Sequence, residues 1–174
     1  MKKAQYFFLL LLMGCSASKV ITDYDAKTNF TQFKTYNFYE DVGAGLNELD
    51  VKRGVDALIA QMNQLGFKQE ETPDFYINFK TKLSQPKVTN TIAIGLGSGG
   101  RNGGFGVSGG IPIGGKKIDE ELTVEFVDAK TNELFWQAIL KSTIKEKRTP
   151  EERTLYFNEV IRKILQSYPV KKKE

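Results

Sequence analysis

Two stretches of the chain repeat apolar residues at the spacing of an α-helix. The first starts after Asn47, a residue type that caps helices, and stops at Gly66. The second starts after Thr149, with Pro150 at the first helical position and Glu152 placed to complete a capping box. We therefore expect two amphipathic helices. Their predicted buried stripes are Val51, Val55, Leu58, Ile59, Met62 and Leu65, and then Phe157, Val160, Ile161, Ile164, Leu165 and Tyr168.

Other segments alternate apolar and polar residues, which is typical of half-buried strands. Residues 20–25 and 35–39 show this pattern, and residues 128–133 form a turn between the last two strands. The alternating apolar positions of the later strands are Phe75, Ile77 and Phe79, then Leu122, Val124 and Phe126, then Leu134, Trp136, Ala138, Leu140 and Ile144. Strands dominate and hairpin turns outnumber crossovers. We therefore predict an α+β fold, an antiparallel sheet with both helices packed on one face.

Residues 91–115 are rich in glycine, and we predict that they form a hairpin or a mobile flap. Apolar residues alternate there with glycines, which leaves one face of the hairpin nearly bare. Such a face favours close approach by another backbone, a ligand or a membrane. The predicted interaction residues on this face are Gly95, Gly97, Gly104, Gly106 and Gly110.

Two glycine patterns in the same segment resemble nucleotide-binding motifs. Residues 95–100 fit G-x-G-x-x-G, but residues 101–104 form a turn where that motif needs a helix. Residues 110–116 fit most of a phosphate-binding loop, but Lys117 stands where a Ser or Thr should hold magnesium. We therefore predict no nucleotide, no metal and no other cofactor.

The first residues have the pattern of an export signal. Lys2 and Lys3 precede the apolar run at residues 7–13, and polar residues follow from Ser16 onward. A membrane-spanning helix needs about 20 apolar residues, so this run is too short to be one. We therefore interpret residues 1–14 as a cleavable signal peptide.

The run ends in Leu12-Met13-Gly14-Cys15, which resembles the lipobox of bacterial lipoproteins. That resemblance implies cleavage before Cys15 and a diacylglycerol on its thiol, with residues 15–19 as a lipidated tether. Met13 departs from the small or branched residues usual at its position, and the alternative is cleavage after Ala17 without lipid. The tether carries no acidic residue, which resembles the sorting pattern of outer-membrane lipoproteins that face the periplasm.

Composition narrows the possible chemistry. The chain has 25 lysines and arginines against 21 acidic residues, and the two lysines of the signal account for part of that excess. No basic face of the kind that binds nucleic acid is expected, because much of the remaining excess lies in the tail at residues 169–174. The chain has no histidine, and its one cysteine is Cys15, which the lipobox resemblance assigns to lipid. We therefore expect no histidine-based triad, no thiol nucleophile and none of the usual zinc sites.

Paired carboxylates remain as candidate catalytic groups. Asp23 with Asp25, or Glu120 with Glu121, could in principle act as acid and base. An exposed strand face with turn capping explains the aspartates more simply. We place Trp136 in the core, because aromatic residues within hairpins usually pack there.

The pentapeptide Asp-Ala-Lys-Thr-Asn occurs at residues 25–29 and again at residues 128–132. We place each copy between the strands of a hairpin that leads to a helix. One interpretation is an ancient strand-strand-helix duplication. The other is repeated turn chemistry, because Asp and Asn hydrogen-bond their own backbone in turns.

Several short motifs resemble a known bacterial lipoprotein family. They are Asp23-Tyr24-Asp25, Phe33-Lys34-Thr35-Tyr36 with Phe38, Pro73-Asp74-Phe75, the glycine-rich middle, and residues 127–131 with Trp136. Together they resemble the family catalogued as domain of unknown function 4136, over nearly the whole mature chain. The resemblance implies a fold and an envelope address, and it supplies no site residues.

We therefore expect one α+β domain at residues 20–168, anchored to the cell envelope through Cys15. The expected function is non-enzymatic binding, with another envelope protein as the partner and no nucleic acid. A binder of a small apolar or glycan ligand, in the sheet face or under the glycine-rich flap, is the alternative. A carboxylate-based hydrolase is the remote one.

Overall fold

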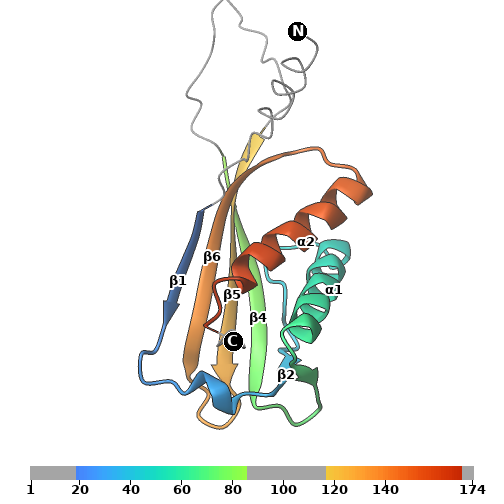
Figure 1. The fold of residues 1–174 in the computed structure, drawn as a ribbon. Coiled ribbons are helices and arrows are strands. Elements are labelled where there is room, and N and C mark those ends of the chain that lie inside the picture. Colours follow the sequence, from blue (N-terminus) through green and yellow to red (C-terminus); the bar gives the residue numbers. More distant parts are fainter. Residues whose placement is uncertain (1–18, 86–116, 170–174) are drawn as a thin grey trace, which may run out of the picture.

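The structure, a computed structural model, describes residues 19–85 and 117–169 (Figure 1). Helices and strands follow one another along the described chain as β1 (Lys19–Tyr24), the 3-10 helix η2 (Phe30–Gln32), β2 (Thr35–Phe38), α1 (Glu48–Gln64), β3 (Lys68–Gln69), β4 (Phe75–Ser84), β5 (Lys117–Asp128), β6 (Leu134–Lys145) and α2 (Pro150–Leu165). This is the predicted α+β class. Strands β4 and β5 extend further toward residues 86–116 than the apolar alternation indicated.

The strands form one sheet in the order β1-β6-β5-β4-β2-β3. Neighbours from β1 to β4 are antiparallel, whereas β2 runs parallel to both β4 and β3. The prediction of a purely antiparallel sheet was therefore wrong, and the sheet is mixed. The reason is α1: a helix between β2 and β4 provides the crossover that parallel strands require.

Both helices begin where the sequence indicated, and α1 also ends there, whereas α2 ends at Leu165, before Tyr168 of its predicted stripe. The Asn47 side chain accepts a hydrogen bond from the Asp50 backbone and caps α1, and Gly66 turns the chain beyond its end with φ +86°. At α2, Thr149 and Glu152 form the predicted capping box. Only glycine adopts such a positive φ readily, so Gly66 gives α1 a defined end.

Both helices cover the same face of the sheet (Figure 1). Alternate residues in the aromatic-rich halves of β4, β5 and β6 point into this layer and are buried, including Phe79, Val124 and the predicted core residue Trp136. Helix α1 lies so close to β4 that a Cβ added to Gly54 would be 2.5 Å from the Phe79 ring. No described residue forms a layer over the other sheet face, which we call the open face.

The two copies of the pentapeptide lie in different settings. The second copy joins β5 and β6, which are antiparallel neighbours, as predicted. The first follows β1, but β1 pairs with β6 and β2 pairs with β4, so β1 and β2 do not form a hairpin. Asp25 accepts a hydrogen bond from the Lys27 backbone, and Asp128 accepts one from the Lys130 backbone. These bonds favour repeated turn chemistry.

Several sequence-based predictions lie outside the described residues. They are the signal peptide at residues 1–14, Cys15 and the tether up to residue 18, the hairpin at residues 91–115 with its five interaction glycines, and the tail from residue 170. Lys19, which we assigned to the tether, is the first residue of β1. The folded sheet therefore begins four residues after Cys15.

Candidate functional site

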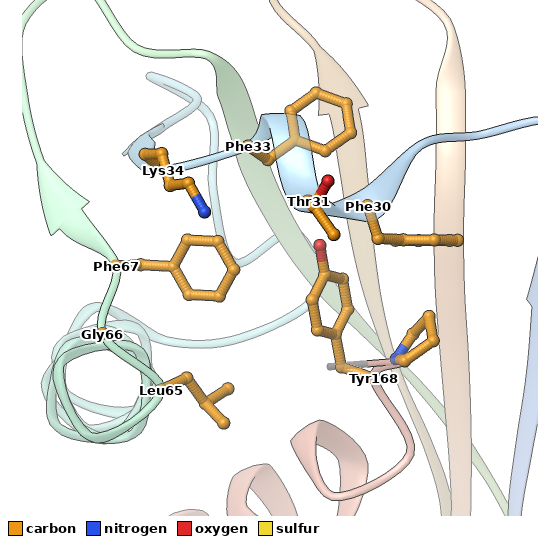
Figure 2. Close-up of a pocket in the computed structure, with 9 residues that line it drawn as sticks. Phe30, Thr31, Phe33, Lys34, Leu65, Gly66, Phe67 and Tyr168 are labelled. Carbon is orange, nitrogen blue, oxygen red and sulfur yellow. The ribbon is translucent and has the colours of Figure 1, made fainter. Parts of the chain in front are cut away.

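A cavity of about 210 Å³ opens at the end of the domain where β1 finishes and β6 starts. Four aromatic rings dominate its wall, and Figure 2 shows them converging with Thr31 and Lys34 around one space. The lining residues come from η2 and the residues after it, from the end of α1, and from the residues after α2. They are Phe30, Thr31, Phe33, Lys34, Leu65, Gly66, Phe67, Tyr168 and Pro169.

Local sequence explains how the wall is assembled. Asn29 caps η2 by accepting hydrogen bonds from the backbone and the hydroxyl of Thr31, at 3.2 and 2.7 Å. Asp74 accepts bonds from the backbone of Lys34 and Thr35, at 2.8 and 3.0 Å. Burial raises the pKa of Asp74, but these backbone bonds outweigh burial and lower it. Asp74 is therefore ionised near neutral pH and holds this side of the cavity in place.

Tyr168 carries a polar group that points into the ring cluster. Its side chain packs edge-on against Phe30, with ring centroids 5.5 Å apart, and against Phe67, at 5.8 Å. Figure 2 shows its hydroxyl directed between Phe33, Phe67 and Thr31. That hydroxyl is buried and has no hydrogen-bond partner among the described residues, and burial raises the pKa of Tyr168. The cavity therefore contains a neutral donor with nothing to donate to.

The lining of the cavity offers groups that can hold a ligand. Its rings offer apolar and π surfaces, the tyrosine offers one hydrogen bond, and the exposed Lys34 offers positive charge at the rim. None of the described residues that line it carries a carboxylate. Within residues 19–85 and 117–169, no cluster of acidic and cysteine side chains could hold a metal ion.

A buried polar network occupies the opposite half of the helix-covered face. Glu120 is 2% exposed and accepts hydrogen bonds from the hydroxyls of Thr81, at 3.1 Å, and Tyr156. Burial and the Glu120 carboxylate both raise the pKa of Tyr156. Ser142 bonds the same tyrosine at 2.9 Å, and the guanidinium of Arg148 lies 4.5 Å from the centre of its ring. Each of these hydroxyls is engaged, so the network links β4, β5, β6 and α2 structurally.

A second buried carboxylate joins the two helices. Asp50 is 2% exposed and contacts Arg53, at 2.7 Å, and Arg153 in the first turn of α2. The Asn47 side chain donates to it at 2.8 Å. Because a buried carboxylate is stable only when its oxygens are paired, this cluster fixes the contact between the starts of α1 and α2.

The structure separates the carboxylates that we had considered as catalytic pairs. Glu120 points into the helix layer, whereas Glu121 points to the open face and pairs with Lys141 at 2.8 Å. Asp23 and Asp25 accept hydrogen bonds from neighbouring backbone amides, at 2.9 Å each. Neither predicted pair faces another carboxylate across a cleft. The turn-capping interpretation of the aspartates is confirmed.

The open face carries the exposed part of β1. Ile21 is 44% exposed and lies opposite Ile139 of β6 in the register. Side chains alternate along strands, so both isoleucines point away from the buried Ala138 and Leu140. Salt bridges and hydrogen bonds surround them, including Lys80 with Glu125 at 2.6 Å. The isoleucine pair is therefore an apolar contact surface at the β1 edge of a largely polar face.

Sequence reasoning missed the cavity and both buried carboxylates. Phe30 and Phe67 lie outside the predicted helices and strands, so periodicity gave no signal for them. Tyr168 was predicted to be buried, which is confirmed, but nothing indicated its unpaired hydroxyl. Asp50 is an ordinary acidic residue in the first turn of a helix, and Arg153 is 103 residues away. The one available signal was the alternation of β5, which places Glu120 with Leu122 and Val124 on the inward face.

No described helix is long and apolar enough to cross a membrane. Among curated proteins, no sequence matches this chain.

Several solved structures share the fold at low identity. One is a PDZ domain protein from Parabacteroides distasonis, with a TM-score of 0.56 and 14% identity, covering 90% of this chain. The chain spans 36% of the length of that protein. A PelC dodecamer from Paraburkholderia phytofirmans has a TM-score of 0.54 at 8% identity, covering 90% of this chain and 100% of its own. A protein from Bacteroides thetaiotaomicron, described as a DUF4136 family member, has a TM-score of 0.51 at 15% identity, over 87% and 96% of the two chains.

A family model decides the classification. The model described as "Domain of unknown function (DUF4136)" matches residues 20–170, which include every described strand and helix except the first residue of β1. The chain therefore belongs to the DUF4136 family.

Proposed function

We propose that this protein is a lipid-anchored, non-enzymatic binding module of the bacterial cell envelope. In this proposal Cys15 carries the lipid, the domain lies on the periplasmic side of the outer membrane, and the open sheet face binds another envelope protein. The open face is the observation that carries the proposal. One side of the sheet packs on two helices, while the other exposes Ile21 beside Ile139 with no covering layer of described residues.

A further copy of the chain is the first partner to test. PelC, which has a similar fold, forms a dodecamer. Membrane anchoring also favours self-association, because it holds copies of the domain at high local concentration in one plane. Ile21 and Ile139 would then be covered in the assembly and exposed in the single domain.

Lipid attachment is tested on the native protein by intact-mass analysis. A chain that begins at Cys15 with added acyl mass supports the anchor, whereas an unmodified chain that begins at Ser18 contradicts it. The Cys15→Ser variant should fold normally, because Cys15 precedes the first strand by four residues. Stable attachment comes from acyl chains, so without the thiol the protein should be released from membranes by a high-salt wash, which leaves a lipid-anchored protein attached.

Binding through the open face is tested by crosslinking in intact cells. Ile21→Glu places a charge on the apolar pair of the open face without entering the core, and it should abolish the crosslinked species. The matched control is Leu155→Glu on α2, where the original side chain is 69% exposed on the other side of the molecule. Equal crosslinking in both variants contradicts the proposed face, and crosslinks to an unrelated protein alone exclude self-association.

A specific observation favours a second function, the binding of a small apolar molecule that carries a hydrogen-bond acceptor. The observation is the unpartnered hydroxyl of Tyr168 in the aromatic cavity, with Lys34 at the rim. A small carboxylate such as benzoate fits these features, since its ring would lie among the phenylalanines and its oxygens would reach the tyrosine or the lysine. The sequence had suggested the sheet face or the glycine-rich segment for such a ligand, and the described lining residues of this cavity belong to neither.

Tryptophan emission can report on this cavity. The single tryptophan, Trp136, lies 5.4 Å from the ring of Tyr168. Titration with benzoate should change the emission in a saturable way, and Tyr168→Phe should weaken binding by removing one hydroxyl. The control is Tyr24→Phe, because Tyr24 is 53% exposed and does not line the cavity. An emission that does not change at any benzoate concentration contradicts the ligand site.

A further inference from the structure

Five lysines gather at the end of the open face that is remote from the aromatic cavity. At this end β1 and β5 begin and β4 and β6 finish (Figure 1). The register places their side chains on the same face, because each alternates with a residue that points into the helix layer. We call this end of the domain the lysine end. Its five lysines, all of them exposed, are Lys19, Lys82, Lys117, Lys141 and Lys145.

Two pairs of these lysines lie directly opposite each other on neighbouring strands. Lys19 is the register partner of Lys141, and Lys117 is the partner of Lys145. Like charges placed directly opposite on a sheet repel and destabilise the pair. A negatively charged group placed beside both pairs would relieve this repulsion.

Acidic side chains at this end balance only part of the charge. Glu121 pairs with Lys141 at 2.8 Å, and Asp119 accepts a hydrogen bond from Thr143 at 2.7 Å. Lys145 lies 4.0 Å from Glu152, with its side chain 71% exposed. Such solvent-exposed contacts are weak and leave the ammonium groups free to exchange partners. The open face therefore has a net positive charge at this end.

The chain leads from the lysine end directly to the proposed lipid anchor. Lys19 is four residues from Cys15, and four extended residues span at most about 14 Å. Strand β5 is 12 residues long, so its other end, near the aromatic cavity, lies about 40 Å from the lysine end. Charges on a membrane act over about 8 to 10 Å at physiological salt. The anchor would therefore bring the lysine end, and not the aromatic end, within reach of the lipid headgroups.

From this geometry we propose that the lysine end binds the headgroups of anionic phospholipids and sets the orientation of the domain on the membrane. The lysines supply electrostatic attraction, and the short tether supplies proximity. In this orientation the aromatic cavity opens away from the membrane. The proposal rests on the lipid anchor of the proposed function for its biological setting, but headgroup binding can be measured without the lipid.

The test uses the chain from residue 15 onward with Cys15→Ser, which carries no acyl group. It should sediment with vesicles of equal parts phosphatidylglycerol and phosphatidylcholine, and not with vesicles of phosphatidylcholine alone. Each lysine near an anionic surface raises the binding constant about fivefold at most, and salt screening reduces this gain. Replacing three lysines should therefore lower vesicle binding by at least about tenfold. The test variant is Lys19→Gln with Lys117→Gln and Lys145→Gln.

A matched variant controls for net charge. It replaces Lys27, Lys68 and Lys130, three exposed lysines near the opposite end of the sheet, by Gln. Binding by this variant should stay within about twofold of the parent, because these residues lie beyond the Debye length. Equal losses in the two triple variants, or equal binding to neutral and anionic vesicles, would overturn the proposal.

A second measurement reads the orientation in the lipidated protein. The lipid blocks the thiol of Cys15, so a single introduced cysteine can carry a fluorescent label. A label at Lys117→Cys should be quenched by spin-labelled headgroups, and a label at Lys130→Cys should not. Equal quenching at the two positions overturns the orientation. Absence of acyl mass on native protein would instead contradict the anchor alone and leave the vesicle comparison standing.

Discussion

The two ends of the sheet are built from different chemistry. At the end that holds the aromatic cavity, which we call the aromatic end, the rings of Phe33 and Phe135 stack with their centroids 4.1 Å apart. The ring centroids of Phe126 and Trp136 are 4.6 Å apart. At the lysine end, the interior holds the carboxylate of Glu120 with two hydroxyls, and the surface holds opposed lysines. Aromatic packing stabilises a fold most, whereas buried polar groups and like charges stabilise it least. The aromatic end therefore contributes most to stability, and the lysine end is where we propose contact with the membrane.

The largest expected effect is at the aromatic end. Trp136 is fully buried and packs against Phe126 and Tyr168. Trp136→Ala should lower the free energy of unfolding by about 3 to 5 kcal/mol, because it leaves a cavity that the neighbouring rings cannot fill. Urea denaturation followed by circular dichroism measures this loss. In the unmodified protein, tryptophan emission that iodide quenches freely would contradict the buried position.

A smaller loss is expected from the polar interior of the lysine end. Glu120→Ala removes the acceptor of two buried hydroxyls and should cost about 1 to 3 kcal/mol. Its neighbour Glu121 is the matched control, because it points to the open face and pairs with an exposed lysine. Glu121→Ala should leave the urea midpoint almost unchanged. Equal effects of the two substitutions would show that the buried network is not a distinct structural unit.

Alkaline pH should weaken both ends through their tyrosines. The folded-state pKa values of Tyr156 and Tyr168 are raised above the ordinary value of 10.0, mainly by burial. Below pH 10.0 both tyrosines are neutral in the folded and unfolded chains, and their contribution to stability is fully present. As the pH rises above 10.0, the unfolded chain loses protons first, so the free energy of unfolding falls. Urea midpoints from pH 9 to about 11 measure this slope, which Tyr168→Phe should reduce.

The smallest effect on stability is expected from the segment between β4 and β5. Replacing residues 90–116 by a short Gly-Ser turn should move the thermal midpoint by only a few degrees. The physical reason is that β4 and β5 pair without interruption up to Ser84 and Asp119, so a short turn can close them. Crosslinking in cells should fail before stability does. A fall of far more than about 10 °C would show that the segment belongs to the core.

Short-range patterns predicted much of the architecture, because their causes are local. The caps at Asn47 and Thr149 were found from the residue types and their spacing to the next backbone amides. The β5–β6 hairpin was found because its turn and its two alternating strands are adjacent in the chain. The stripe of α2 indicated its buried side chains, whereas of the α1 stripe only Leu58 and Met62 are buried. The candidate lipid site at Cys15 was also found locally, from a motif of four residues.

Contacts between distant segments were decided by the tertiary structure. The parallel pairing of β2 with β4 depends on where α1 packs, and no local pattern in β2 encodes it. The cavity needs residues 30–34, 65–67 and 168–169 to meet, and the Asp50–Arg153 contact needs both helices to be docked. The lysine end likewise exists only because the register aligns four strands. Residue types and spacing determine the local elements, whereas burial and strand register, which act across the whole chain, decide which elements become neighbours.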